Sequence, residues 1–538
     1  MTRRQVTIIT ILSIAAMILV VLISRRLWFR LDLTENKAYT ISPVSRNLYT
    51  EIPDQVRITY YISEKLSAVH PVPGQLEDLL REFTAYSRGR IQLTVRDPLK
   101  AGLNREVESL GLIPQQIEIV ERDQANIAQV YSGIVIEYLD QIDVIPFAFV
   151  LSTLEYDLTS RIRTLVRGAP REAAFLVGDP GKEWSRDYAI LNQIFTQSGF
   201  RIRTINPGEE IPDSLSSLFV LGGVEGLDDW ALYRIDRYIQ GGGKVLFAVD
   251  GVFIDESNAL QGRLMMDQGL QSMVSFYGAT VKPELAMDVT ALGLSYQSVD
   301  PSGFRIYRTV RYPLWIGIQA QNRNPDHPLT AAFDGIDVFW ASPLELNPPD
   351  GVTATPLFYT TAEAWSMTKD FALNPEMSYQ FQAEINETKG EKLLGAALYG
   401  KFPSWFAGMS KPVREGSEEE LPDMPAETKE SRIIVIGDTD LVSAITQYTR
   451  SDRNFDFFLK AADWLGNDDD IIGIRSRQTQ LGRLDKITDA EKRLNAMAFA
   501  RYLNVIFIPL VVIALGIFRS LQRRRSLQRQ VKESSDGV

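Results

Sequence analysis

Three apolar segments of this chain, 173–177, 218–221 and 433–436, are each followed by polar residues or glycines that could bind a ligand. Such segments are expected to be strands of a parallel sheet, and the ligands of these sheets bind beside the carboxyl ends of the strands. The candidate ligand-binding residues are Asp179, Lys182, Glu183, Gly222, Gly223, Asp438 and Asp440.

Each of these groups also has a plainer interpretation. Asp438 and Asp440 could hold a metal ion, but an Asp-rich strand end is more often a turn and a helix cap, so no metal site is predicted. The glycines at 222–223 could let a ligand approach the backbone, although a tight turn is their commoner role. Gly181-Lys182 is similar to the end of a P-loop, but Leu176 and Glu183 replace the glycine and hydroxyl residue that a P-loop needs.

The chain has little material for catalysis. It contains no cysteine and only two histidines, His70 and His327, so thiol nucleophiles, disulfides and His-based triads or metal sites are disfavoured. His327 lies between Asp326 and Pro328, where a structural role is the commoner one. No GxGxxG motif occurs, and the net charge of −11 argues against nucleic-acid binding. We therefore predict no catalytic residue, no cofactor and no enzymatic activity.

The elements that must position the candidate residues form a repeating pattern. The apolar segments 173–177, 218–221 and 245–249 alternate with amphipathic helical segments at 187–198 and 231–239. Strands that are apolar on both faces and separated by helices predict a doubly wound α/β domain. The segment 200–205 alternates in polarity and is expected near a sheet edge, and 433–436 is expected to return to the same sheet. We assign residues 169–480 to this central domain, with a flexible acidic loop at 409–432.

Residues 25–168 predict a separate N-terminal α/β domain. Its strand-like segments and a helix at 76–86 are followed by a helix at 154–166, which Gly168 and Pro170 end. Three arginines lie off the apolar stripe of that last helix and are expected to form a solvated face. They are Arg161, Arg163 and Arg167.

The region 293–344 is rich in aromatic side chains, which could bind sugar or peptide but are more often core and strand residues. These aromatics are Tyr307, Tyr312, Trp315, Phe333, Phe339 and Trp340.

Two apolar segments near the ends predict membrane spans, at 6–24 and 503–518. The first has no convincing cleavage site for a signal peptide, and the second, which could otherwise be a core helix, is followed by a basic tail at 519–538. With the short tail 1–5 and a connecting helix at 481–502, this predicts an inner-membrane protein. Both termini are expected in the cytoplasm, the main body outside it, and membrane lipid as a partner.

Several spaced motifs of this chain resemble the auxiliary proteins of ABC transporters known as the gliding-motility-associated GldG-like family. They are Asp32-Leu33-Thr34, Tyr39-Thr40-Ile41-Ser42-Pro43, Leu154-Glu155-Tyr156-Asp157-Leu158-Thr159-Ser160, Tyr238-Ile239-Gln240-Gly241-Gly242-Gly243-Lys244, Val435-Ile436-Gly437-Asp438-Thr439-Asp440, Ala462-Asp463-Trp464-Leu465-Gly466-Asn467 and Ile472-Gly473-Ile474-Arg475.

The resemblance implies a central domain similar to class I glutamine amidotransferase-like folds without the catalytic residues. It also implies two partners, an ABC permease and an ATP-binding subunit. Family members often carry a Gly-His-Gly-Glu-like turn, which here reads 178–183 without a histidine, so the resemblance does not carry a ligand role to this turn.

Three functions follow from these observations. The leading hypothesis is a membrane-anchored extracytoplasmic accessory subunit of an ABC transporter, which binds a substrate or an envelope partner and couples to the permease. The alternatives are a structural or polysaccharide-binding envelope scaffold and, less favoured, an envelope hydrolase. Homo-oligomer formation is left open.

Overall fold

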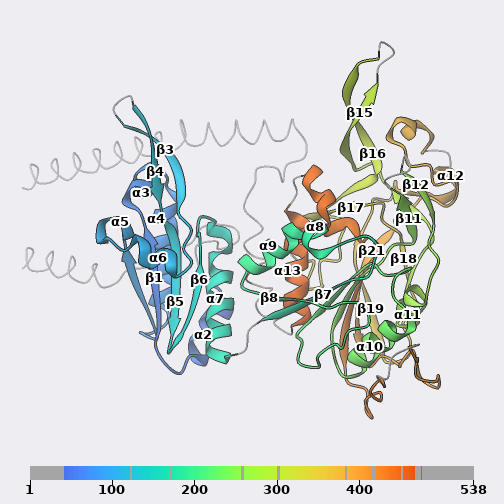
Figure 1. Cartoon of the computed structure of the whole chain (residues 1–538), viewed down its shortest axis with the longest axis horizontal. Helices are drawn as coiled ribbons and strands as arrows, with labels where there is room; N and C mark the ends of the chain where they lie inside the picture. The colour runs from blue at the N-terminus through green and yellow to red at the C-terminus, as the bar shows by residue number, and fades with distance from the viewer. Residues whose placement is uncertain are drawn as a thin grey trace, which may run out of the picture. The chain divides into compact units, whose positions relative to one another are not determined.

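A computed structural model describes residues 41–466 and Ile474, apart from short gaps at 122–123, 169–170, 256–259, 300–302, 332, 382–384, 415–419 and 450–451 (Figure 1). Within these ranges no helix is long and apolar enough to cross a membrane. The predicted spans 6–24 and 503–518 lie outside the described ranges, as do both predicted tails and the predicted connecting helix 481–502. The described chain is a mixed α/β protein, so this part of the predicted fold class is confirmed.

The N-terminal domain is built on a four-stranded sheet in the order β2-β1-β5-β6, in which β1 and β2 are parallel and the other pairs are antiparallel. The strands are β1 (Val56–Ile62), β2 (Ile91–Arg96), β5 (Ser132–Tyr138) and β6 (Gln141–Ile145), with a separate hairpin of β3 (Gln115–Glu121) and β4 (Gln124–Val130). The helices are α2 (Pro43–Glu51), α3 (Glu64–Val69), α4 (Val72–Ala85), α5 (Pro98–Ala101), α6 (Asn104–Ser109) and α7 (Leu151–Arg167). Apolar faces of α2, α4 and α7 pack with the sheet in one core.

Two of the spaced motifs meet inside this domain. Glu155 of α7 accepts hydrogen bonds from the backbone N–H of Ser42 at 2.7 Å and from the hydroxyl of Ser45 at 2.6 Å. Ser42 also caps α2, because its side chain accepts from the backbone N–H of Ser45 at 3.1 Å. The buried Glu155 therefore fixes the start of α2 against α7.

The prediction of a solvated arginine face on α7 is wrong for two of its three residues. Arg161 and Arg163 are each only 5% exposed. The guanidinium of Arg161 pairs with Asp143 at 2.6 Å, and that of Arg163 lies 3.7 Å from Glu51. Acidic side chains from β6 and α2 neutralise these charges, which the helical pattern of α7 alone does not reveal.

The central domain contains a seven-stranded sheet in the order β19-β21-β22-β10-β9-β7-β8. Its strands are β7 (Glu172–Val177), β8 (Arg201–Thr204), β9 (Leu218–Leu221), β10 (Val245–Ala248), β19 (Val352–Tyr359), β21 (Leu393–Gly400) and β22 (Ser431–Ile436). The five strands from β22 to β8 are parallel, and β21 and β19 continue the sheet in antiparallel pairing. The edge position of β8 and the return of β22 to the sheet are both as predicted.

Helices cover both faces of this sheet. Side chains of α9 (Ala189–Gln197) and α13 (Arg453–Leu465) pack with Phe175 and Phe219 on one face. Those of α10 (Asp229–Gln240) and α11 (Leu270–Phe276) pack with Leu176 and Val220 on the other. The predicted helix 187–198 is two helices, the short α8 (Trp184–Asp187) and α9, which meet at Tyr188.

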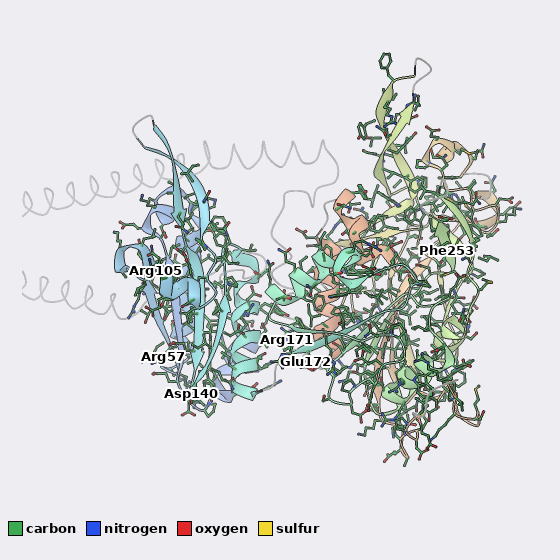
Figure 2. The ribbon with its side chains drawn as sticks, in the orientation of Figure 1. Arg57, Arg105, Asp140, Arg171, Glu172 and Phe253 are labelled. Carbon is green, nitrogen blue, oxygen red and sulfur yellow. The ribbon has the colours of Figure 1, made fainter. Side chains whose placement is uncertain are left out.

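Arg171 and Glu172 are neighbours at the start of β7 (Figure 2). The guanidinium of Arg171 pairs with the buried Asp463 of α13 and lies 3.9 Å from the centre of the Phe200 ring. This ion pair fastens α13 to the beginning of the sheet.

Smaller sheets complete the central domain. They are formed by β15 (Ala291–Val299), β16 (Arg305–Gln319) and β17 (Gly335–Phe339), by β11 (Val252–Asp255) with β12 (Gln261–Leu264), by β13 (Ala279–Val281) with β18 (Leu344–Leu346), and by β14 (Leu285–Met287) with β20 (Trp365–Met367). Further short helices are α12 (Ile385–Thr388), η1 (Pro375–Gln380), η2 (Asp440–Val442) and η3 (Ala444–Tyr448).

The aromatic side chains of residues 293–344 are mostly core residues, as predicted. Those buried are Tyr312, Trp315, Phe333, Phe339 and Trp340. Of the six aromatic residues named in the sequence analysis, Tyr307 is not buried, because it lies on the outer part of β16 and is 81% exposed. In the predicted acidic loop 409–432, Leu421 is buried against the α10 side of the sheet, and the Tyr233 hydroxyl of α10 donates to the carbonyl oxygen of Pro422 at 3.0 Å.

Candidate functional site

The carboxyl ends of four parallel strands, β7, β9, β10 and β22, bring distant segments of the chain together. Adjacent strands in this set are hydrogen-bonded in register, so the residues that follow them lie at one edge of the sheet. We name the resulting group of side chains the strand-end cluster. It consists of Asp179, Lys182, Tyr188, Asp250, Asp438, Thr439 and Asp440.

Asp179 joins the loop after β7 to the loop after β9. Its carboxylate accepts a hydrogen bond from the backbone N–H of Gly223 at 2.7 Å. The backbone φ angles of Gly222 and Gly223 are 70° and 109°, a conformation that residues with a side chain rarely adopt. A Cβ atom on Gly222 would also overlap the carboxylate of Asp179. These glycines therefore allow two loops of the protein to approach each other, and the space beside Gly222 is filled by Asp179.

The loop after β9 is held from its other side as well. Glu225 receives two hydrogen bonds from the guanidinium of Arg263 on β12, at 2.6 and 2.8 Å, and one from the backbone N–H of Met266 at 2.8 Å. The guanidinium of Arg263 in turn lies 4.3 Å from the centre of the Phe253 ring on β11. The hydrogen bonds from Arg263 lower the pKa of Glu225, so this carboxylate remains charged and keeps the loop in place.

Lys182 and Asp440 form an ion pair across the cluster. Their side chains are 25% and 14% exposed, so the pair is partly open to solvent. Burial opposes the charge on Lys182, but attraction to Asp440, Tyr188 and Asp179 outweighs it and raises the pKa of the lysine well above its usual value. Lys182 is therefore a permanent cation, suited to binding an acceptor group and unsuited to acting as a nucleophile.

Asp250 and Asp438 hold the loop after β22. The carboxylate of Asp250 accepts from the backbone N–H of Thr439 at 2.8 Å and from its hydroxyl. The carboxylate of Asp438 accepts from the backbone N–H groups of Phe339 and Asp440, both at 2.7 Å. In this structure Asp438 thus supports the turn that presents Asp440.

Burial and mutual repulsion keep protons on these two carboxyl groups. Burial, followed by the charges of Asp440 and Asp179, raises the pKa of Asp250 to about 7. Burial, followed by the charges of Asp250 and Asp440, raises the pKa of Asp438 well above its usual value. The cluster therefore carries less negative charge near neutral pH than its number of aspartates suggests.

Tyr188 supplies a polar group that the protein itself does not satisfy. Its side chain is fully buried, and its hydroxyl has no hydrogen-bond partner among the described residues. Burial raises the pKa of Tyr188. The charge of Lys182 opposes this rise, and the charges of Asp440, Asp179 and Asp250 add to it, so the hydroxyl interacts electrostatically with the other members of the cluster. A buried hydroxyl of this kind can be satisfied by a water molecule or by a group of a ligand.

Six of the seven sequence-predicted ligand residues meet at this edge, and Glu183 does not take part. The Glu183 side chain is exposed, its charge acts on Arg186, and its backbone N–H donates to Asp187 at 2.7 Å. The sequence analysis missed Asp250, although it follows the apolar segment 245–249 by the same rule that selected Asp179. It also missed Tyr188, whose helical spacing is typical of a core residue.

The two histidines lie in other surroundings. The His327 ring lies 5.2 Å from that of Trp464, and its Nδ1 accepts from the backbone N–H of Leu329 at 3.3 Å. The His70 ring lies 4.7 Å from that of Phe149 in the N-terminal domain. Within the described ranges, no group of three or more His, Cys, Asp or Glu side chains could hold a metal ion. The strand-end cluster thus combines a cation, carboxylate acceptors and a hydroxyl without a partner among the described residues. These groups could form hydrogen bonds with a ligand.

The fold is thus an α/β domain in which polar side chains lie together at the carboxyl ends of four parallel strands. Residues 170–471 match a family described as an ABC-type uncharacterized transport system. Because the match covers more than half of the chain, the protein belongs to this family of ABC transport-system auxiliary proteins. Residues 35–137 match a domain of unknown function.

Individual proteins are similar to this chain at low identity. An uncharacterized protein of Borreliella burgdorferi is 26% identical over 512 residues, which are 93% of this chain and 94% of the relative. Among solved structures, the mmIFT52 N-terminal domain aligns with a TM-score of 0.31 at 12% identity, over 55% of this chain and 96% of that one. A ThuA-like protein from Parabacteroides merdae aligns with a TM-score of 0.28 at 10% identity, over 56% and 91%. TM-scores this low carry no argument about fold or function.

Proposed function

We propose that this protein is a membrane-anchored, extracytoplasmic accessory subunit of an ABC transporter, related to the GldG-like proteins, and that its strand-end cluster binds a substrate or an envelope component. Family membership supports the association with a transporter. The apolar segments 6–24 and 503–518 support the anchor, and the basic tail 519–538 supports the orientation. The partners in this proposal are a multi-span permease and an ATP-binding subunit.

The observation that carries the binding role is the buried Tyr188 hydroxyl, which has no hydrogen-bond partner among the described residues, beside the partly exposed pair of Lys182 and Asp440. A group that needs a hydrogen bond and a charge pair that solvent can reach occur together at the edge where α/β sheets bind ligands. Lys182 offers hydrogen-bond donors, and Asp440 and Asp179 offer acceptors. The ligand in this proposal therefore carries both an acceptor group and hydroxyl or amino donors.

The test of the transporter association is affinity purification of the tagged full chain from its native membranes, followed by mass spectrometry. We expect a permease and an ATP-binding subunit to co-purify, and they should also co-purify with Lys182→Met, because the strand-end cluster binds ligand in this proposal and does not hold the permease. Recovery of neither subunit with the unaltered chain would overturn the association.

The orientation has an independent test. Val413 is 87% exposed, so a reporter domain inserted after it should not disturb the core. We expect alkaline phosphatase, which is active outside the cytoplasm, to be active at this position. A reporter that is active only in the cytoplasm would contradict the proposed location of the main body.

No specific observation favours either of the two alternative functions. A hydrolase of the Ser-His-Asp kind needs a histidine next to its nucleophile, and neither His70 nor His327 belongs to the strand-end cluster. Of the scaffold alternatives, a purely structural one would leave Tyr188 and the Lys182–Asp440 pair without a role, whereas a polysaccharide-binding one would use the same groups.

A further inference from the structure

Three of the spaced motifs, 154–160, 462–467 and 472–475, meet at Tyr156 of α7. The Tyr156 side chain is fully buried, and it packs against Ile474 and Val44. Its hydroxyl donates a hydrogen bond to the buried Asp463 of α13 at 2.7 Å and accepts one from the guanidinium of Arg171 at 3.0 Å. Because Arg171 also pairs with Asp463, the three polar side chains form one group. We call these five residues the chain-end joint.

The chain-end joint brings together the segments that lead to the two predicted membrane spans. Val44 belongs to α2, the first described helix, and follows the predicted span 6–24. Ile474 is the last described residue and precedes the predicted span 503–518. Both pack against the same tyrosine side chain, so the two segments start from one place in the fold.

Helix α13 connects this joint with the strand-end cluster. Asp463 lies near the carboxyl end of the helix, and Asn454 lies near its amino end, about 14 Å away along the helix axis. The Asn454 side chain donates to the carbonyl oxygens of Leu441 at 2.5 Å and Asp337 at 2.6 Å. Leu441 follows Asp440 in η2, so α13 holds the residue next to the ion pair of the strand-end cluster.

The helix between these two contacts is packed along its length. All residues of α13 apart from Arg453 and Asp456 are buried. The ring of Phe458 stacks on that of Phe219 in the central sheet, with 5.7 Å between the ring centres. Closely packed protein interiors are hard to compress and transmit strain. A displacement at the carboxyl end of α13 is therefore expected to reach the loop that its amino end holds.

We propose that α13 couples the strand-end cluster to the chain-end joint, so that the loop carrying Asp440 responds to movement of the two membrane anchors. This inference rests on the proposed function, because the coupling connects the ligand of the accessory subunit with the permease. Asn454 and Asp463 are positioning residues in this proposal, since they hold the ends of α13 and neither belongs to the strand-end cluster. A joint that served packing alone would affect only its own surroundings.

Hydrogen exchange followed by mass spectrometry tests the coupling on the full chain, without a ligand or a transporter. Tyr156→Phe removes the hydroxyl that joins α7 to Asp463 and keeps the packed ring. Tyr277→Phe is the matched control, because this buried hydroxyl also donates to a buried aspartate, Asp236, at 2.7 Å.

The readout is the exchange of the loop after β22. The backbone N–H groups of Thr439, Asp440 and Ser443 are hydrogen-bonded, so their exchange reports opening of this loop. We expect residues 439–443 to exchange at least about threefold faster in Tyr156→Phe than in the unaltered chain. Tyr277→Phe should leave their exchange unchanged.

A second variant tests whether α13 is the connection. Asn454→Ala removes the hydrogen bond to Leu441, so residues 439–443 should exchange faster in this variant as well. Because the contact is then already lost, adding Tyr156→Phe to Asn454→Ala should cause no further increase at these residues.

Three results would overturn the proposal. The first is faster exchange in Tyr156→Phe that is confined to the surroundings of residue 156, and the second is an equal increase at residues 439–443 in Tyr277→Phe. The third is an undiminished effect of Tyr156→Phe in the Asn454→Ala chain. Because no transporter takes part in this measurement, a failure to recover transporter subunits would overturn the proposed function separately and leave these exchange rates unaffected.

Discussion

Two buried polar clusters of the central domain differ in how completely they are satisfied. Asp236 of α10 is fully buried, and its carboxylate accepts from the Tyr277 hydroxyl at 2.7 Å, the Ser404 hydroxyl at 2.7 Å, the Phe406 backbone N–H at 3.1 Å and the Gln240 side chain at 3.1 Å. Four donors from α10, the residue after α11 and the segment after β21 thus surround one carboxylate. We call this group the Asp236 cluster.

The strand-end cluster has the opposite character. Several acidic groups are close together, the pKa values of Asp250 and Asp438 are raised, and the Tyr188 hydroxyl has no partner among the described residues. The ion pair of Lys182 and Asp440 is partly exposed to solvent, whereas Asp236 is fully buried. A fully hydrogen-bonded buried network stabilises one conformation, and a partly satisfied one costs stability unless something else completes it. The Asp236 cluster is therefore complete within the fold, and the difference is consistent with the proposal that the strand-end cluster binds a ligand.

The largest effect is expected from Asp236→Ala. It leaves the buried Tyr277 hydroxyl and Phe406 N–H, and the half-buried Ser404 hydroxyl, without this acceptor, so the free energy of unfolding should fall by about 3 kcal/mol or more. Urea denaturation monitored by tryptophan fluorescence measures this change. Asp423→Ala is the control, because that side chain is 89% exposed and pairs at the surface with Lys411, so its loss should leave stability almost unchanged. A cost for Asp236→Ala as small as the control's would refute the structural role.

The second prediction concerns pH. Folded Asp250 keeps its proton to about pH 7, whereas an unfolded aspartate loses its proton near pH 4. Between these values the folded state binds more protons, so a rise in pH lowers the free energy of unfolding, by up to about 1.4 kcal/mol per pH unit for this one group. Asp250→Asn should make the decrease in stability between pH 4 and pH 7 shallower. An unchanged slope would show that Asp250 titrates normally.

Lys182→Ala should have an intermediate effect. Loss of the cation leaves Asp440 near Asp179 and Asp250, so stability at pH 8 should fall by about 1–2 kcal/mol, discounted for the partial exposure of the pair. The cost should shrink at pH 5, where carboxyl groups bind protons. The double variant Lys182→Ala/Asp440→Asn should regain much of the loss, and strictly additive costs would argue against the pair.

The smallest effect on stability is expected from a pair of tyrosine substitutions, one in each cluster. Tyr188→Phe removes a hydroxyl that has no partner in the described part of the chain, so the free energy of unfolding should change by less than about 0.5 kcal/mol or rise slightly. Tyr277→Phe removes a hydroxyl that donates to Asp236 and should cost about 1–2 kcal/mol. Equal costs for the two variants would mean that Tyr188 is satisfied in solution.

Much of the fold could be predicted because the strands of the central sheet are apolar on both faces, which few other structures require. Because residues that follow parallel strands lie at the same edge of a sheet, Asp179, Asp438 and Asp440 could also be predicted to lie at one edge. Tyr188 could not be found this way, since its ring has the spacing of a core residue and only three-dimensional packing shows that its hydroxyl is unpaired.

The burial of Arg161 and Arg163 escaped prediction for a similar reason. Their neutralising partners, Asp143 and Glu51, are supplied by other elements, and no periodicity within α7 signals them. Tyr307 shows the reverse case, an aromatic residue in an aromatic-rich region that the fold leaves in water.

The most direct test of the central claim is the ATPase activity of the co-purified transporter complex, measured with Tyr188→Phe and with Tyr277→Phe at a temperature where both chains are folded. If the strand-end cluster binds the ligand, Tyr188→Phe should alter the activity while keeping full stability, and Tyr277→Phe should lose stability while keeping the activity. Normal activity with Tyr188→Phe, together with altered activity in a folded Tyr277→Phe complex, would contradict the assignment of the binding role to the strand-end cluster.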